Sequence, residues 1–317
     1  MEGPAFPATE FAHFKLIYFW IIFNACALAL LALDMKLRRR GHAVGFREAL
    51  LRSAVWVAIA AAFAVFVRYW FGHQAALEFV TGYVIELSLS VDNLFVFLLV
   101  FQYFAVPEEQ QHRVLFWGIL GALIMRGLFI VAGVGLLQRF HAIFYAFGVL
   151  LIFSGIRILA TGDRPRDPSK NPVVKLVRRW FPVTDHYVGG KFLVRSAAGT
   201  AVTPLLLVLL VIETTDLLFA VDSVPAVLAI TLNAFVVYTS NVLAILGLRS
   251  LYFAVAGVMK MFRFLHHGLA VILMLTGLKM LIADRYPTST VYALSAVGVI
   301  LVTAILASLA WPGKANA

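Results

Sequence analysis

Two stretches inside apolar segments carry acidic residues in one shared pattern. Glu86–Phe97 reads ELSLSVDNLFVF and Asp216–Val227 reads DLLFAVDSVPAV, so each begins with an acid, followed after five residues by an aspartate and a small polar residue. A carboxylate inside a bilayer is costly, and it usually lines an ion path or pairs with another charge. The repeated pattern therefore predicts a cation site to which both stretches contribute.

The candidate ligands are side chains that bind metal ions through oxygen atoms. Carboxylates together with Asn93, Ser223 and Asn241 suit hard divalent cations such as Mg²⁺, Ca²⁺ and Mn²⁺, and these stretches contain no sulfur ligand for a soft metal. The ligand chemistry does not choose among the three ions. Buried carboxylates also take up protons readily, so exchange of a metal ion for protons is the mechanism that this chemistry most directly permits.

The spacing of the acids constrains how they can meet. Glu86 and Asp92 are six positions apart, about 240° around a regular helix, so their convergence on one ion needs local unwinding or a neighbouring helix. Pro225 and Gly82 favour such breaks. Asp216 lies three residues after Glu213, which places both on one helix face.

Two arginines in apolar segments offer the acids another partner. Simple pairing of the carboxylates with Arg126 and Arg249 is the alternative to a cation site. The five acids outnumber the two arginines, however, so the carboxylates that remain unpaired need a cation unless they are protonated. We expect both arginines to position carboxylates, or to replace the ion during a transport cycle.

The elements that carry these residues are predicted to be membrane helices. The chain is 62% hydrophobic and 13% charged, and its apolar runs repeatedly exceed the roughly 20 residues that cross a bilayer. The prediction is an all-α polytopic membrane protein with about nine spans. They cover residues 14–34, 53–71, 77–104, 113–138, 141–160, 203–231, 234–258, 266–283 and 289–311.

The basic residues predict the orientation. The formal charge is +10, and most of the basic residues fall in the segments 36–52, 164–195 and 260–263, which lie on one side if nine spans alternate. This pattern indicates topology and not nucleic-acid binding, and it places the N-terminus outside and the C-terminus in the cytoplasm. Cys26 is the single cysteine, so no intrachain disulfide can form.

The sequence also contains a predicted internal repeat. A shift of 130 residues lays Glu86 on Asp216 and Asp92 on Asp222, while Arg126 matches Arg249 and Gly155 matches Gly277 at slightly smaller shifts. The matched units are spans three to five and six to eight. Because three is odd, the second unit enters the membrane from the opposite face, as in secondary transporters with a midplane site. Within one transmembrane domain, 1–317, we expect two N-terminal helices (1–75), repeat one (76–160), a basic cytoplasmic loop (161–200), repeat two (201–283) and a C-terminal helix (284–317).

The motifs resemble the TerC family of bacterial integral membrane proteins. The resemblance rests on ELSLSVDNLFVF, on ETTDLLFAVDSVPAVLAIT from Glu213 and on YTSNVLAILGLRSLYF from Tyr238. Alx-like members are regarded as manganese exporters related to LysE-type transporters, so the resemblance implies Mn²⁺ as the exported substrate and a role in metal homeostasis as an antiporter. It implies metal roles for Glu86, Asp92, Asn93, Glu213, Asp216 and Asp222, which Arg126, Arg249, Asn241 and Ser223 would support.

Other functions compete with proton-linked export. The family resemblance also allows a membrane partner that supplies metal to secreted or membrane enzymes. An enzyme is not expected, because neither a Gly-x-Gly-Asp element nor a His-Glu-x-x-His motif occurs, and no permanently bound cofactor is expected. The expected partners are the lipid bilayer, the divalent cation, protons and proteins at the membrane. The segment 171–181 reads as a short amphipathic helix on the cytoplasmic membrane surface.

Overall fold

The structure is a computed structural model of the 317-residue chain. It describes residues 8–36, 46–140, 142–161, 172–196, 199–256, 264–283, 285–286 and 289–310. The contacts divide the chain into two compact units, 1–42 and 43–317. The first unit holds one helix, α1 (Ala8–Lys36), and the second holds every other described element.

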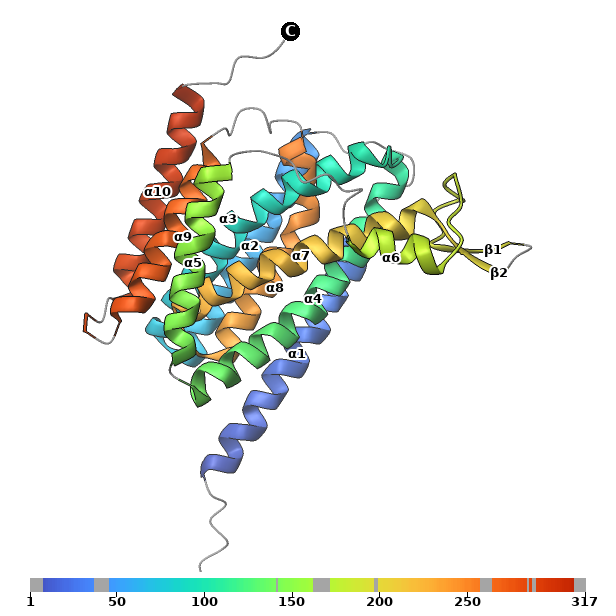
Figure 1. Ribbon diagram of the computed structural model, residues 1–317. Helices are drawn as coiled ribbons and strands as arrows, with labels where there is room; N and C mark the ends of the chain where they lie inside the picture. Colours follow the sequence, from blue (N-terminus) through green and yellow to red (C-terminus); the bar gives the residue numbers. More distant parts are fainter. Residues whose placement is uncertain are drawn as a thin grey trace, which may run out of the picture. The chain divides into compact units, whose positions relative to one another are not determined.

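The described part of the second unit contains nine helices and one short hairpin (Figure 1). They are α2 (Phe46–Phe71), α3 (His73–Tyr103), α4 (Glu108–Arg139), α5 (Ala142–Thr161), α6 (Pro172–Trp180), β1 (Leu193–Ser196), β2 (Gly199–Val202), α7 (Pro204–Leu228), α8 (Ala234–Ala256), α9 (Leu265–Ile282) and α10 (Thr290–Ala310). Local signals fix several helix starts. The Asn233 side chain accepts hydrogen bonds from the backbone N–H groups of Phe235 and Val236 at the start of α8, and Pro204 opens α7.

The predicted membrane helices are present as helices. Each of the nine predicted spans falls on a described helix, and seven helices (α1, α2, α4, α5, α7, α8 and α10) are long and apolar enough to cross a bilayer. The apolar stretch His267–Ile282 of α9 is shorter, and a full crossing by α3 stays a prediction. The molecule is therefore a polytopic membrane protein whose described part is almost entirely helical.

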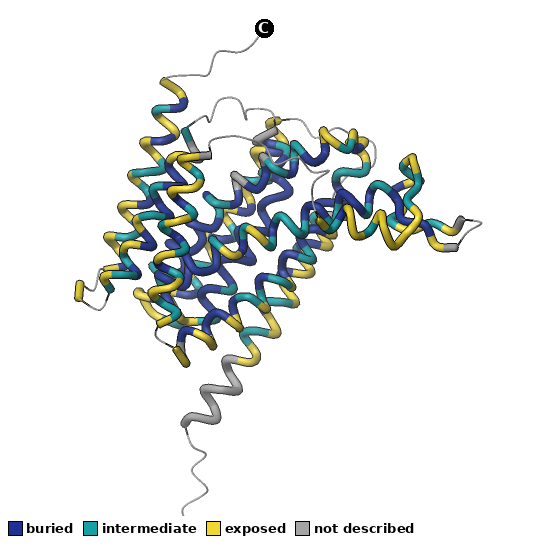
Figure 2. The backbone as a smooth tube through the Cα atoms, in the orientation of Figure 1, coloured by how far each residue is buried: buried dark blue, intermediate teal, exposed yellow. Residues whose placement is uncertain are grey.

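The centre of the second unit is α8. Every residue from Thr239 to Ser250 is buried, and α2, α3 and α4 pack against this helix (Figure 2). Gly82 makes a close approach possible: a Cβ atom there would lie 2.9 Å from Ser240 Oγ and 3.0 Å from Val227 Cγ1. Gly82 thus lets α3 pack tightly against α7 and α8, and it does not break its helix.

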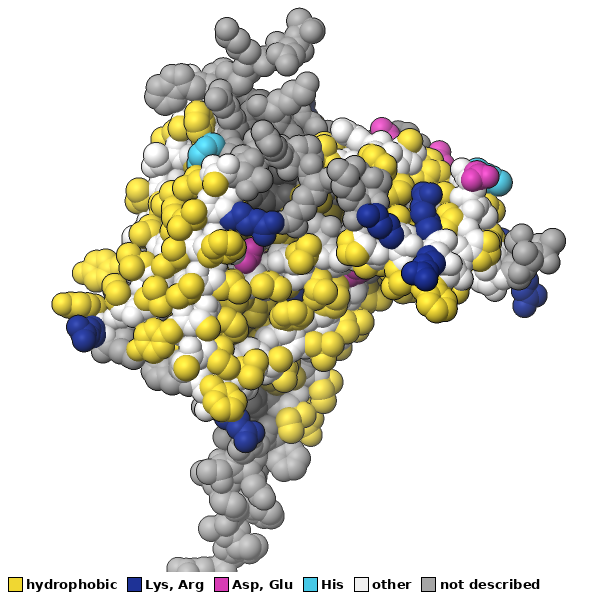
Figure 3. All heavy atoms as spheres, viewed as in Figure 1, with side chains coloured by type: hydrophobic (Ala, Val, Ile, Leu, Met, Phe, Trp, Pro, Cys, Tyr) yellow, Lys and Arg dark blue, Asp and Glu magenta, His cyan; other side chains and the backbone are white. Residues whose placement is uncertain are grey.

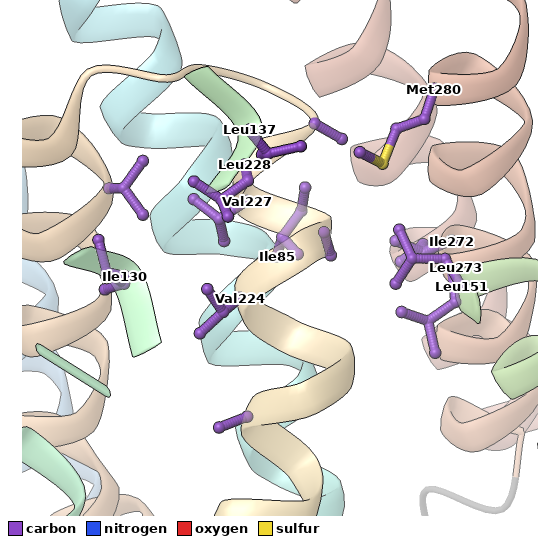
Figure 4. Close-up of a cluster of buried hydrophobic side chains, with 14 of the residues drawn as sticks. Ile85, Ile130, Leu137, Leu151, Val224, Val227, Leu228, Ile272, Leu273 and Met280 are labelled. Atoms are coloured by element: carbon purple, nitrogen blue, oxygen red, sulfur yellow. The ribbon is translucent and has the colours of Figure 1, made fainter. Parts of the chain in front are cut away.

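Two further helices, α5 and α9, pack against one another along glycines. A Cβ atom on Gly277 would lie 2.5 Å from the carbonyl oxygen of Gly148, and one on Gly155 would lie 2.6 Å from the carbonyl oxygen of Ala270. Because the contact moves backwards along α9 as it moves forwards along α5, the two helices run antiparallel. Figure 4 shows Leu151 beside Ile272 and Leu273 in this part of the apolar core.

The connection between α5 and α7 contains a helix where a short helix was predicted over 171–181, and also a hairpin that was not predicted. Its described part contains α6 and the antiparallel hairpin β1–β2, in which Leu193 pairs with Val202. The Tyr187 hydroxyl donates to the carbonyl oxygen of Phe104 at 2.7 Å, and Arg113 Nη1 donates to that of Gly190 at 2.7 Å. The first bond attaches the segment to the turn after α3, and the second attaches it to α4 (Figure 1).

Candidate functional site

The acidic positions of the two matched stretches lie near the middles of α3 and α7. In α3, Asn93 follows Glu86 by seven residues, and in α7, Ser223 follows Asp216 by the same number. Seven residues are close to two helical turns, so each pair shares one helix face. The two faces meet, because α3 packs against α7.

One arginine joins these faces. Arg126 of α4 is 1% exposed, and its guanidinium contacts the carboxylates of Glu86 through Nη1 and of Asp216 through Nη2, the latter at 3.3 Å from Oδ1. Nη1 also donates to Asn241 Oδ1 at 2.9 Å and lies 3.3 Å from Ser223 Oγ. Four helices, α3, α4, α7 and α8, therefore converge on a single buried guanidinium. We call these five residues the Arg126 cluster.

Two further polar side chains complete its surroundings. Asn93 Nδ2 donates to Asp216 Oδ1 at 3.4 Å, and Ser90 Oγ donates to Glu86 Oε1 at 3.3 Å. Glu86 is 0% exposed and Asp216 3% exposed, so both carboxylates are separated from water. Burial of this kind makes each unmatched charge expensive.

The cluster leaves hydrogen-bonding capacity unused. Within the described part of the chain, Glu86 Oε2 and Asp216 Oδ2 are buried oxygens without a hydrogen-bond donor. Two carboxylates also face one guanidinium, so the formal charge of the cluster is negative when both are ionised. Buried oxygens of this kind are where a cation or a proton would bind.

The remaining predicted ligands lie around the cluster or away from it. Glu213, half-buried and one turn before Asp216, places its carboxylate against Gly121 of α4, where any larger residue would collide with it. Asp222 points elsewhere and accepts a hydrogen bond from Ser154 Oγ of α5 at 2.6 Å. The side chain of Asp92 lies outside the described residues. Of the predicted supporting residues, Arg126, Asn241 and Ser223 join the cluster, and Arg249 is buried in α8.

Glu86 and Asp216 come together without the helix breaks that the sequence favoured. Both α3 and α7 are continuous across the matched stretches, and Pro225 lies inside the last turn of α7. Pro225 cannot donate to the carbonyl of Val221, but α7 continues to Leu228, so the loss of this one hydrogen bond does not break the helix. Packing of α3 against α7 brings Glu86 and Asp216 together, while a meeting of Glu86 and Asp92 on one ion stays a prediction.

The side chains of the Arg126 cluster do not form a metal-coordination sphere in the described arrangement. Among the residues that the structure describes, no group of three or more His, Cys, Asp and Glu side chains is placed to hold a metal ion. Arg126 instead occupies the position between the two carboxylates. A metal ion could bind there only after the guanidinium withdraws.

Two contacts of the acidic side chains were not predicted from the sequence. Ser90, four residues after Glu86, could have been identified from helix periodicity, because positions i and i+4 share a face. Ser154 gave no such signal, since it lies 68 positions before Asp222 and on another helix. Packing of α5 against α7 brings it within reach.

Fold and site together define a polytopic integral membrane protein with a buried, charged cluster between its helices. Residues 71–316 match the integral membrane protein TerC family, and the chain belongs to this family. It is 43% identical over 291 residues to an uncharacterized membrane protein of Myxococcus xanthus, with 92% of this chain and 91% of the relative covered.

Two further relatives bear a functional name. A protein of Escherichia coli K12 is 41% identical over 300 residues (90% of this chain, 93% of the relative), and one of Photorhabdus laumondii is 38% identical over 309 residues (94% and 96%). Both are named as candidate membrane-bound redox modulators, Alx. No solved structure matches the chain.

Proposed function

We propose that this protein is a secondary transporter that exports divalent cations, with Mn²⁺ as substrate, in exchange for protons. The Arg126 cluster is the observation that carries the proposal. Its guanidinium is held between two buried carboxylates, each of which keeps an oxygen without a donor in the described part of the chain. In this arrangement Arg126 acts as an internal cation that a metal ion would replace.

Charge explains why replacement is feasible. A divalent cation between Glu86 and Asp216 would neutralise both carboxylates, whereas Arg126 neutralises one. Without either cation, protonation of the two acids would remove the same charge. The cluster can therefore alternate between metal-bound and proton-bound forms, which is the exchange that an antiporter needs.

The proposal includes two inverted three-helix units, α3–α5 and α7–α9. The contacts across α3 and α7 support it. A shift of 130 residues turns the contacting pair Asn93 and Asp216 into the pair Ser223 and Glu86, and both members of this second pair contact Arg126 Nη1. Such exchange of pairs is expected when a two-fold axis relates two antiparallel helices.

The glycine contacts of α5 and α9 support the same symmetry. A shift of 122 residues turns the pair Gly148 and Gly277 into the pair Ala270 and Gly155, which is the second close contact of these antiparallel helices. Helices packed through small residues can slide with few side chains in the way. The seam between the two units is therefore suited to the rocking motion of alternating access.

The ion and its direction have separate support. Oxygen ligands favour a hard divalent cation, while manganese and export follow from the family resemblance. The name of the relatives suggests a redox role, which in this chain would act through metal supply, because Cys26 has no second cysteine to pair with. On this proposal the protein is not an enzyme and keeps no permanently bound cofactor.

The membrane orientation belongs to the proposal as well. In a bacterial inner membrane, the alternation of nine spans places the α3–α4 turn and the α5–α7 segment together in the cytoplasm. The hydrogen bonds from Tyr187 to Phe104 and from Arg113 to Gly190 support this grouping. The C-terminus would lie on the same side and the N-terminus outside.

Reconstitution of the purified protein in liposomes tests the function. Mn²⁺ movement and internal pH are recorded together, with Mg²⁺ and Ca²⁺ as comparisons and Asp92→Asn as the impaired variant. We expect Mn²⁺ flux coupled to proton movement in the opposite direction. Absence of flux of every cation in demonstrably folded protein would reject the transporter and favour the alternative, a membrane partner that supplies metal to other enzymes.

A further inference from the structure

The segment between α5 and α7 exposes an excess of positive charge. Within the described residues 172–203, Asp185 is the one acidic residue. Five basic side chains are exposed there: Lys175, Arg178, Arg179, Lys191 and Arg195. A surface of this composition attracts anions, because its own segment offers little acidic charge to pair with the basic side chains.

Helix α6 has one face that packs against α7 and one face that is exposed. Val174 is 3% exposed on the side where α6 packs against α7. On the free side, Leu176 and Trp180 lie four residues apart, are 57% and 71% exposed, and form an apolar stripe. Lys175 and Arg179, also four residues apart, form a basic stripe beside it.

The apolar stripe continues past the helix. Phe181, directly after α6, is 53% exposed. We call Lys175, Leu176, Arg178, Arg179, Trp180 and Phe181 the α6 patch. Figure 3 shows Lys and Arg side chains next to hydrophobic ones on this end of the molecule.

The chemistry of the α6 patch fits the interface of a membrane. Tryptophan prefers the headgroup level of a bilayer, and basic side chains beside it bind anionic headgroups. The patch also lies at that level, because Pro182, directly after it, accepts a hydrogen bond from the backbone N–H of Val202, two residues before the membrane helix α7 begins at Pro204. A water-exposed surface offers no comparable partner for Trp180 and Phe181.

We propose that the α6 patch binds the anionic phospholipid headgroups of the surrounding bilayer. Lys175, Arg178 and Arg179 contact the headgroup phosphates, while Leu176 and Trp180 enter the layer below them. The bound segment is tied to the α3–α4 turn through Tyr187 and continues into α7, so lipid holds it against helices of the Arg126 cluster. The proposal stands independently of cation transport.

A fluorescent label on the patch provides the test. In full-length protein carrying Cys26→Ser, Leu176→Cys is labelled with an environment-sensitive fluorophore, and the protein is reconstituted in phosphatidylcholine vesicles with increasing phosphatidylglycerol. Quenching by acrylamide, a neutral molecule, reports exposure of the label to water. We expect quenching to fall as phosphatidylglycerol increases and to recover at high salt.

Charge variants test whether the basic side chains of the patch cause this response. In Lys175→Gln/Arg178→Gln/Arg179→Gln, the apparent affinity for phosphatidylglycerol should fall about five-fold for each removed charge. The control Arg285→Gln, an exposed arginine between α9 and α10, should respond like the parent. Equal quenching with and without phosphatidylglycerol, or an unchanged response of the triple variant, would overturn the proposal.

Discussion

Asp216 Oδ1 of α7 lies 3.3 Å from Arg126 Nη2 of α4, and this buried contact joins the two proposed three-helix units. The same guanidinium contacts Glu86 of α3. If these units move apart in the proposed transport cycle, the free energy of opening depends on what neutralises the two acids. Arg126 does so in the described arrangement, and a metal ion or protons would do so in others.

Removal of the internal cation should make the protein depend on added metal. In Arg126→Gln, two buried carboxylates lose their counter-charge, and we expect the free energy of unfolding to fall by about 3–5 kcal/mol. Thermal unfolding in detergent measures the loss. Added Mn²⁺ should raise the unfolding temperature of this variant more than that of the parent, because no guanidinium competes for the acids.

A second arginine serves as control for this change. Arg157 of α5 is exposed, so Arg157→Gln should leave the unfolding temperature nearly unchanged and its response to Mn²⁺ equal to that of the parent. An Arg126→Gln protein as stable as the parent, with no added response to Mn²⁺, would contradict the role of Arg126.

The glycine seam between α5 and α9 should tolerate no added methyl group. In Gly277→Ala the new Cβ would meet the backbone oxygen of Gly148 at 2.5 Å, so the helices must separate. We expect a loss of about 1–3 kcal/mol in the free energy of unfolding, together with slower flux in liposomes.

The matched control is a glycine with free space around it. A Cβ on Gly298 of α10 would meet no atom within 4 Å, so Gly298→Ala should be neutral or stabilise the helix by up to about 1 kcal/mol. If both alanine variants behaved alike, the close approach of α5 and α9 would be refuted.

Asp222 should act through Ser154 and not through Arg126. Ser154→Ala removes the donor that lies 2.6 Å from Asp222 Oδ1. A hydrogen bond to a charged group contributes about 1.5–3 kcal/mol, so stability should fall by this order while Mn²⁺ affinity at the Arg126 cluster stays unchanged. Ser88→Ala is the control, because Ser88 Oγ donates to the Val84 carbonyl of its own helix. Equal effects of the two variants would show that the contact with Asp222 contributes nothing.

The Tyr187 contact should depend on pH in a defined range. Burial raises the pKa of the Tyr187 hydroxyl from its ordinary value of 10.0 to about 12, so folding favours the neutral phenol. The stability that this group adds is fully present below pH 10 and is lost as the pH rises towards 12. Tyr187→Phe should lower the free energy of unfolding by about 1 kcal/mol at neutral pH and remove this pH dependence.

An exposed tyrosine completes that experiment. Tyr292 is 75% exposed, so Tyr292→Phe should change neither stability nor its pH dependence. Absorbance titration of the parent against Tyr187→Phe gives the phenol pKa directly. A Tyr187 that titrates near its ordinary pKa of 10.0 would contradict its burial.

The helices were predictable from sequence because long apolar runs have one stable form in a bilayer. The contact of Glu86 and Asp216 with a common partner was predictable too, because each opens one of the two matching sequence patterns. The choice of Arg126 as their common partner was not, since sequence treats Arg126 and Arg249 alike. Only the packing of α4 against α7 and α8 brings Arg126 to Glu86 and Asp216.

The errors have equally physical causes. Pro225 suggested a broken helix, but its place in the last turn of α7 makes the break unnecessary. The hairpin β1–β2 was missed because its strands have four residues each, too few for a periodic pattern. Asp222 points away from the Arg126 cluster because it lies six residues after Asp216 and therefore on another face of the helix. Its contact with Ser154 results from tertiary packing and could not be predicted from the sequence.

Equilibrium binding of Mn²⁺ to the purified protein, with proton release recorded in the same titration, tests the central claim most directly. The parent should bind Mn²⁺ with release of protons, and Asp185→Asn, which changes an exposed loop acid, should match it. Glu86→Gln/Asp216→Asn should bind at least about 10-fold more weakly, because even outer-shell changes at metal sites cost that much. If the folded double variant bound Mn²⁺ as tightly as the parent, the Arg126 cluster would not be the cation site.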